Sequence, residues 1–264
     1  MSDEPARFGP VDVLQIASKL TIDDATFVIG GQATNLWAWF YQDRTPELSS
    51  SSELTSKDID YFGTKKAAES LAQALGGKVY LPNADDMNTP NTAVVVAEVN
   101  GKKLQIDFMH GVLGLTKREL ENGVSVIRLE ADSDGKLLRA DVAVMHPVLC
   151  LKSRVANMLS PATMRRDKFA WKQLYATIAI LEVYIRDALD DGDIKEVNRC
   201  FREIFNYLRS DRYGRRVVDE LGADPLKILE TFASDSRLDE RYRELTLGKM
   251  IDRIVTARQR RHDT

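Results

Sequence analysis

The chain has 264 residues, of which 44% are hydrophobic and 29% charged, a globular composition that excludes extensive disorder. Its formal net charge of −3 does not indicate a strongly basic nucleic-acid-binding protein. The two cysteines, Cys150 and Cys200, are too few for a disulfide framework, and the three scattered histidines argue against a zinc-hydrolase site.

The charge is unevenly distributed along the chain. Residues 1–138 carry 13 basic and 20 acidic side chains, a net charge of −7, whereas residues 139–264 carry 24 and 20, a net charge of +4. An acidic metal site facing an anionic ligand would give such a split, and so would unrelated surfaces. The acidic start Met1–Pro5 and the short apolar runs predict neither a signal peptide nor a bilayer-spanning helix, so we expect a cytoplasmic soluble protein.

The first half of the chain alternates helical and extended patterns. Helical spacing of apolar residues predicts helices over 11–20, 32–41 and 65–75. Short apolar or alternating runs predict strands over 25–29, 57–62, 78–81, 93–99, 103–109, 124–129 and 138–144. Asn100-Gly101 is a strong hairpin signal, and the polar segment 42–56 reads as a surface loop. We therefore expect a mixed α/β (α+β) domain over residues 1–145.

Beyond His146-Pro147 the pattern becomes helical. Helices are predicted over 148–159, 168–189, 194–208, 213–221, 226–233 and 241–259. This predicts a helical C-terminal domain over residues 146–264. A single domain whose helices cover one face of the sheet is the alternative.

Three carboxylates stand out by their positions. Asp58 and Asp60 are two residues apart on a predicted strand, so both side chains leave the same face. Asp107 lies in the second arm of the predicted hairpin and could reach the same face. Carboxylate oxygens without nearby His or Cys suit Mg²⁺ or Mn²⁺, and paired ions of this kind serve phosphoryl transfer. A solvated strand face is the alternative interpretation of the Asp-x-Asp pattern.

A glycine pair lies between the first predicted strand and the next helix. There, Gly30-Gly31 could let backbone N–H groups and the helix N-terminus receive phosphate oxygens, although a tight turn is the simpler interpretation. The chain contains neither a P-loop motif nor the G-x-G-x-x-G motif of dinucleotide-binding folds.

The order of these motifs resembles the nucleotidyltransferase superfamily that includes DNA polymerase β. The motifs are Phe27-Val28-Ile29-Gly30-Gly31-Gln32-Ala33-Thr34, then Thr55-Ser56-Lys57-Asp58-Ile59-Asp60, then Gln105-Ile106-Asp107. Within the superfamily, the chain is most similar to AbiEii-like nucleotidyltransferases, the toxins of some toxin–antitoxin and phage-defence systems. The similarity covers roughly residues 25–175 and includes Lys152 and the pair Arg166-Asp167. The 26 residues 32–57 between Gly31 and Asp58 exceed the compact pattern of the superfamily, and the excess lies in the serine-rich loop.

The resemblance implies a metal-dependent transferase that moves an NMP from an NTP onto an acceptor hydroxyl. Asp58, Asp60 and Asp107 would be catalytic and would hold Mg²⁺ or Mn²⁺. The residues expected to surround the nucleotide are Gly30, Gly31, Ser56, Lys152, Arg154 and Asp167. Because residues two apart on a helix face different directions, at most one of Lys152 and Arg154 should point into the cleft.

The implied partners are an NTP, an acceptor such as RNA (the 3′ end of tRNA) or a protein, and an antitoxin protein. Two other functions remain open at this stage. The first is transfer to a small molecule, as in aminoglycoside nucleotidyltransferases, and the second is a non-catalytic nucleotide-binding module.

Overall fold

The computed structural model describes residues 10–20, 26–48, 59–82, 89–99, 101–133 and 136–262. The chain divides into two compact units, residues 1–153 (unit 1) and residues 154–264 (unit 2). The predicted domain boundary near residue 145 lies just before α5 (Pro147–Leu159), and the two units divide within that helix.

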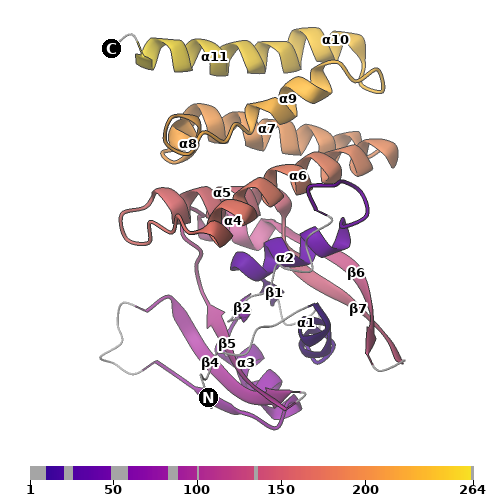
Figure 1. Cartoon of the computed structure of the whole chain (residues 1–264), viewed down its shortest axis with the longest axis vertical. Coiled ribbons are helices and arrows are strands. Elements are labelled where there is room, and N and C mark those ends of the chain that lie inside the picture. Colours follow the sequence, from indigo (N-terminus) through magenta and orange to yellow (C-terminus); the bar gives the residue numbers. More distant parts are fainter. Residues whose placement is uncertain are drawn as a thin grey trace. The chain divides into compact units, whose positions relative to one another are not determined.

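Unit 1 is a mixed α/β unit, as predicted. The described strands are β1 (Phe27–Val28), β2 (Ile59–Phe62), β3 (Lys78–Tyr80), β4 (Asn91–Val99), β5 (Lys102–Met109), β6 (Val124–Ser133) and β7 (Lys136–Met145). They form one seven-stranded sheet in the order β3-β4-β5-β2-β1-β7-β6, in which β2 pairs with β5 and β1 with β7 in parallel and the other pairs are antiparallel. The helices are α1 (Pro10–Ala17), α2 (Gly30–Phe40), α3 (Lys65–Ala74) and α4 (Lys117–Asn122), followed by the start of α5 (Figure 1).

The two faces of this sheet have different roles. Ile59, Tyr61, Ile106 and Phe108 alternate along β2 and β5 and are fully buried or nearly so, with the Tyr61 and Phe108 rings stacked at 5.6 Å. Helix α1 packs on β6 and β7, and α3 packs on β3 and β4. Since successive side chains of a strand point to opposite faces, the residues between these apolar ones project from the other face. Helix α2 begins on that other face.

Local sequence signals explain several element boundaries. Thr64 caps α3 as predicted, because its Oγ1 accepts a hydrogen bond from the amide of Ala67 at 3.2 Å. Gly101 has φ +70° in the turn between the antiparallel strands β4 and β5, which confirms the predicted hairpin, although Asn100 lies outside the described residues. Helix α4 was not expected, and Thr116 and Glu119 form a capping box at its start.

Unit 2 is helical, as predicted for this part of the chain. Its elements after α5 are α6 (Lys168–Asp190), α7 (Ile194–Ser210), the 3₁₀ turn η4 (Gly214–Arg216), α8 (Val217–Leu221), α9 (Leu226–Ala233), α10 (Glu240–Tyr242), the π-helical segment η5 (Arg243–Leu247) and α11 (Gly248–His262). Helix α7 packs on α6, α9 and α11 (Figure 1). The Phe201 and Phe232 rings meet at 5.5 Å in the core of this unit. The single helix predicted over 241–259 is instead divided by the π-helical segment.

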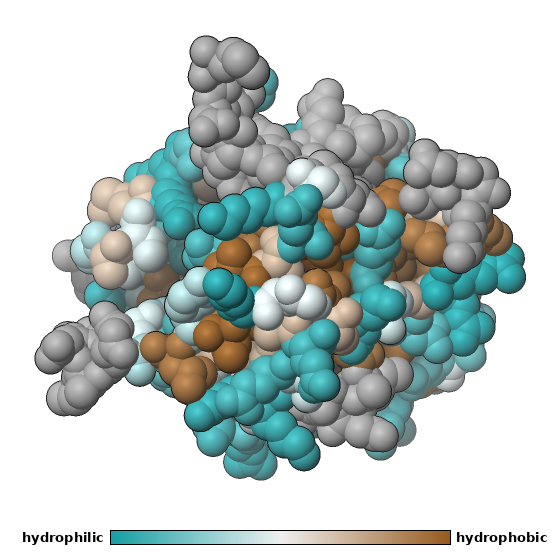
Figure 2. All heavy atoms as spheres, turned by 90° about the horizontal axis from the view of Figure 1, so that it is seen from below, coloured by the Kyte–Doolittle hydropathy of each residue, from teal (hydrophilic) through white to brown (hydrophobic). Residues whose placement is uncertain are grey.

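The surface combines apolar and hydrophilic areas. Figure 2 shows apolar side chains exposed between hydrophilic ones on the face seen from below. Within unit 1, a cavity of about 330 Å³ is lined by residues in and just after α1, by Leu75 after α3, by the end of β4 and by residues near the start of β7. Because α1 and the end of α3 line the same cavity, both helices cover one face of the sheet. No helix in the described parts of the chain is both long enough and apolar enough to cross a bilayer.

Candidate functional site

Asp60 and Asp107 lie side by side on neighbouring parallel strands. They are register partners in the pairing of β2 with β5, next to the buried pair Ile59 and Ile106. Neighbouring strands are about 4.8 Å apart, so the two carboxylates leave the same face of the sheet within reach of a common cation. Both side chains are half-buried. Like charges this close repel each other, and a bound divalent cation would relieve that repulsion.

Helix α2 begins directly against the Asp60 carboxylate. Gly30, its first residue, has φ +66°, and a Cβ placed there would lie 2.5 Å from Oδ2 of Asp60. The amide of the preceding Ile29 donates a hydrogen bond of 2.9 Å to the carbonyl oxygen of Asp60. Only glycine fits this conformation and this contact without a shift. The predicted order of strand, glycine pair and helix is therefore present, and it brings Gly30 to Asp60.

Gln105 lies beside Asp107, although the sequence marks it only as part of the motif Gln105-Ile106-Asp107 and not as a site residue. It lies two residues before Asp107 on β5, and its side-chain amide donates a hydrogen bond of 3.2 Å to Oδ1 of Asp107. This bond orients the Asp107 carboxylate on the exposed face of the strand. The alternation of Gln105 with the buried Leu104 and Ile106 is the signal that could have placed it beside Asp107.

Two predicted site residues lie outside the described residues. Asp58 and Ser56 both precede Ile59, where the described part of β2 begins. Their assignments as metal ligand and nucleotide-binding residue stay predictions. Gly31, in contrast, is described and occupies the first turn of α2 beside Gly30.

Lys152 is buried and pairs with an acid of its own unit. It lies on α5, and its Nζ is 3.0 Å from Oε1 of Glu119 on α4. The other oxygen of Glu119 accepts hydrogen bonds of 2.7 Å from both the amide and the hydroxyl of Thr116. Burial raises the pKa of Glu119, but the hydrogen bonds from Thr116 and Lys152 outweigh that effect and lower it. Lys152 thus anchors α5 to α4 within unit 1, and its role as a triphosphate ligand stays a prediction.

Arg154 and Asp167 both belong to unit 2, where each makes a local contact. The Oδ1 atom of Asp167 caps α6 by accepting hydrogen bonds from the amides of Phe169 at 2.9 Å and Ala170 at 3.0 Å. Arg154 Nη1 donates a hydrogen bond of 2.7 Å to Oε1 of Gln173. These contacts give both residues structural roles in unit 2. Their part in nucleotide binding stays a prediction.

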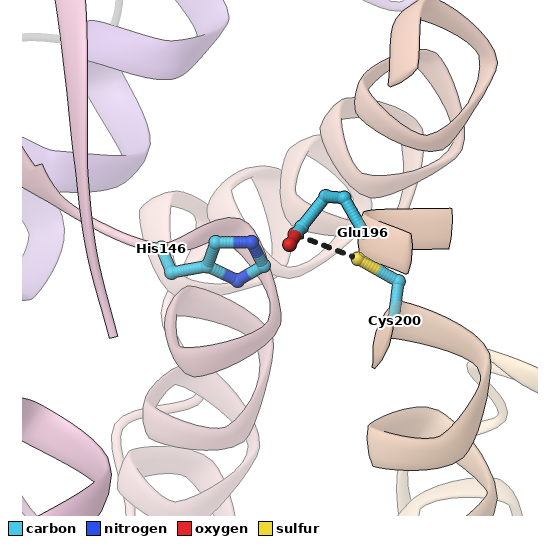
Figure 3. A group of neighbouring side chains, drawn as sticks. All are labelled: His146, Glu196 and Cys200. Carbon is cyan, nitrogen blue, oxygen red and sulfur yellow. Dashed lines mark hydrogen bonds between the residues drawn. The ribbon is translucent and has the colours of Figure 1, made fainter. Parts of the chain in front are cut away.

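Figure 3 draws three further side chains with metal-ligating atoms: Glu196 and Cys200 of unit 2, and His146 of unit 1. Within unit 2, the Glu196 carboxylate accepts hydrogen bonds from the Tyr184 hydroxyl at 3.1 Å and from the Cys200 thiol at 3.4 Å. Arg199 adds two more, at 2.7 and 2.8 Å. Burial, followed by the charge of Glu196, raises the pKa of Cys200 well above its ordinary value, so Cys200 remains a thiol.

His146 belongs to unit 1, where its Nδ1 accepts a hydrogen bond of 3.2 Å from the amide of Val148. It therefore helps to begin α5.

Comparison with known proteins gives no match: no family model, no curated protein and no solved structure is similar to this chain.

Proposed function

We propose that the chain is a metal-dependent nucleotidyltransferase that moves an NMP from an NTP onto an acceptor hydroxyl and releases pyrophosphate. The observation that carries the proposal is the group formed by Asp60, Asp107 and Gly30. Two carboxylates on adjacent parallel strands lie beside a side-chain-free helix start, which combines cation ligands with a helix end suited to phosphate.

The donor set fits hard divalent cations. Asp60 and Asp107 offer only oxygen ligands, and Gln105 holds one oxygen of Asp107 in place. The proposal assigns Mg²⁺ or Mn²⁺ to Asp58, Asp60 and Asp107, with Asp107 also accepting the proton of the attacking hydroxyl. Bound divalent ions would supply charge neutralisation at the reacting phosphate.

The start of α2 is assigned to the triphosphate. The absence of a side chain at Gly30 makes room for the Asp60 carboxylate, and Gly31 likewise adds no side chain beside the amide groups of the first helical turn, to which we assign the phosphate oxygens. The positive end of the helix dipole favours negative charge at the same place. Lys152 would join this site only by exchanging Glu119 for a phosphate oxygen.

The acceptor is assigned from the family resemblance. The resemblance implies transfer in the cytoplasm onto an RNA, such as the 3′ end of tRNA, or onto a protein hydroxyl. It also implies that the chain acts as a toxin with an antitoxin partner.

The proposal is tested by incubating the full chain with each NTP, labelled at its α-phosphate, with Mg²⁺ and with total RNA or cell extract. Label should enter one class of macromolecule, and EDTA should prevent this. Asp60→Asn should lower incorporation by at least about a hundredfold, because metal-based charge stabilisation contributes several kcal/mol to such reactions. The exposed Glu98 on β4 provides a matched control, since Glu98→Gln removes one charge from the same sheet away from Asp60. Equal incorporation by Asp60→Asn and the unmodified chain would overturn the assignment.

A further inference from the structure

The start of α6 in unit 2 presents exposed aromatic and basic side chains together (α6 is labelled in Figure 1). Every residue from 161 to 169 is exposed, and Phe169 and Tyr175 keep 46% and 54% of their surface exposed. Large aromatic side chains are usually buried, so two exposed rings near one helix end suggest a partner that covers them. The α6 surface is defined by the exposed Arg165, Arg166, Lys168, Phe169 and Tyr175 and by the half-buried Lys172.

The charge of this segment is strongly positive. Residues 154–175 contain five arginines and lysines and a single acid, Asp167. That acid is engaged in capping α6, where its carboxylate accepts two backbone hydrogen bonds. Arg166 is itself paired with Glu220 at 3.6 Å, so the exposed positive charge of the α6 surface comes mainly from Arg165 and Lys168 and favours an anionic partner.

The spacing along α6 aligns cations with an aromatic ring. Lys168, Lys172 and Tyr175 follow one another at helical intervals of four and three residues, so they lie on one stripe of the helix. Trp171 stacks on Tyr175 at 6.1 Å and supports that ring from the adjacent turn. Phe169 is adjacent to Lys168 in the first turn.

A small cavity of mixed polarity lies beside Phe169. It measures about 80 Å³ and is lined by Arg154, Arg165, Asn157 and Gln173, together with Asp167 and the Phe169 ring. Arginine, asparagine and glutamine side chains supply donors at its wall, and a single phosphate group is of suitable size. Its position puts phosphate-binding groups next to an exposed ring.

We propose that the α6 surface binds single-stranded nucleic acid, with bases stacked on Phe169 and Tyr175 and backbone phosphates at Arg165, Lys168 and Lys172. Alternating rings and cations match a strand whose bases are unpaired, because every base has a face to stack and every linkage carries a charge. A paired duplex hides its base faces, and an acidic peptide has none. The proposal depends only on residues of unit 2.

The first experiment measures binding of fluorescein-labelled 12-nucleotide oligo(U) and oligo(dT) to the full chain by anisotropy, without NTP. Phe169→Ala should weaken binding about five- to tenfold because stacking is lost, and Phe169→Leu should weaken it to a similar extent. Phe169→Trp should keep the affinity of the unmodified chain, because tryptophan can also stack on a base. The matched control is Leu245→Ala, which removes an apolar side chain that is 47% exposed elsewhere in unit 2. Because the assay contains no NTP, its result is independent of the proposed transfer reaction.

The second experiment measures the salt dependence of the same binding. The double variant Arg165→Ala/Lys168→Ala should reduce the slope of log K against log[salt] by about 1.4, since each phosphate contact to a single strand contributes about 0.7. Lys249→Ala/Arg253→Ala removes two exposed charges from α11 and should leave the slope unchanged.

Equal binding of oligo(U) and oligo(dT) supports a surface for single strands in general, and stronger binding of oligo(U) supports an RNA surface. Two results would overturn the proposal. One is that Phe169→Ala leaves binding unchanged while a duplex or polyglutamate competes as well as the single strand does. This result would indicate a basic surface that binds anions of any kind. The other is an absence of binding by the unmodified chain at low salt.

Discussion

The carboxylates of the two units have different neighbours. Asp60 and Asp107 in unit 1 are neighbours of the same charge on adjacent strands, whereas Glu196 in unit 2 accepts hydrogen bonds from Tyr184, Arg199 and Cys200. Repulsion within the first pair raises the free energy of the unit and is removed by a cation. The second carboxylate is already satisfied by its donors and needs no ion for its stability. Glu196 thus has a structural role in unit 2, whereas Asp60 and Asp107, of which Asp107 also accepts a hydrogen bond from Gln105, are the pair to which we assign the proposed cation.

The largest effect that would sharpen this contrast is stabilisation by Mg²⁺. If Mg²⁺ binds at Asp60 and Asp107, a concentration 100 times its Kd should raise the unfolding free energy of unit 1 by about 2.7 kcal/mol. Asp107→Asn should remove this gain and, by relieving the repulsion, should not destabilise the metal-free chain. Thermal unfolding with and without Mg²⁺ checks both points, with Glu196→Gln as the variant in which the gain persists.

The next largest effect is expected for a substitution at Gly30. Gly30→Ala adds left-handed strain of about 1 to 2 kcal/mol and also a collision with the Asp60 carboxylate, so we expect a total loss of more than about 2 kcal/mol and a loss of Mg²⁺-dependent transfer. Gly76, after α3, has a similar φ of +64° with no neighbour within 4 Å of its Cβ position. Gly76→Ala therefore measures the strain alone. Denaturant unfolding that gives equal losses for both variants would contradict the contact with Asp60.

Removing the Glu196 carboxylate should destabilise unit 2 without affecting the proposed nucleotide transfer. Glu196→Ala leaves the Arg199 guanidinium and the Tyr184 hydroxyl without this acceptor, so the free energy of unfolding should fall by about 1 to 2 kcal/mol. Glu230→Ala, at an exposed position on α9, is the control and should change the stability little. Urea unfolding followed by circular dichroism measures the difference, and a Mg²⁺ requirement that disappeared in Glu196→Ala would contradict the division of roles.

The smallest expected effect is a pH dependence of the unfolding free energy of unit 2. The Arg237 guanidinium, which donates to Asp235 at 3.0 Å, lowers the pKa of Asp235 from 3.8 to about 2. A lowered folded-state pKa stabilises the fold above the ordinary value, and this contribution is lost as the pH falls from about 4 to about 2. Because the pair lies near the surface, the loss should not exceed about 1 kcal/mol. Asp235→Asn should flatten the stability profile in this pH range, and an unchanged profile would rule out the assigned cause.

Much of the fold follows from local sequence patterns, and the failures have local physical causes. The alternation around Ile59 and Tyr61, the Thr64 cap and the turn at Gly101 each predict an element that the structure contains. Helix α4 is too short to show periodicity, and only its capping box at Thr116 and Glu119 marks it. The π-helical segment Arg243–Leu247 cannot be distinguished by apolar spacing from the helix that continues it.

The candidate site was less predictable, because it depends on pairing between distant segments. The sequence identifies Asp60 and Asp107 as candidates, but the register that makes them neighbours is a property of the assembled sheet. The partner of Lys152 is Glu119, 33 residues earlier in the chain, and no local pattern connects the two. Asp167 shows the opposite case, since a polar residue directly before a long helical pattern is the ordinary signature of an N-cap.

The parallel register of β2 and β5 has a consequence for any preparation of this protein. The same alternation that buries Ile106 and Phe108 brings Asp107 opposite Asp60. A slip of one residue would turn Asp107 into the core and Phe108 into water, so a misaligned sheet could not remain stable while losing only its carboxylate pair. Correct assembly of unit 1 and formation of the pair are thus a single event. If the proposed divalent cation binds this pair, its binding stoichiometry would count the correctly folded molecules in a sample.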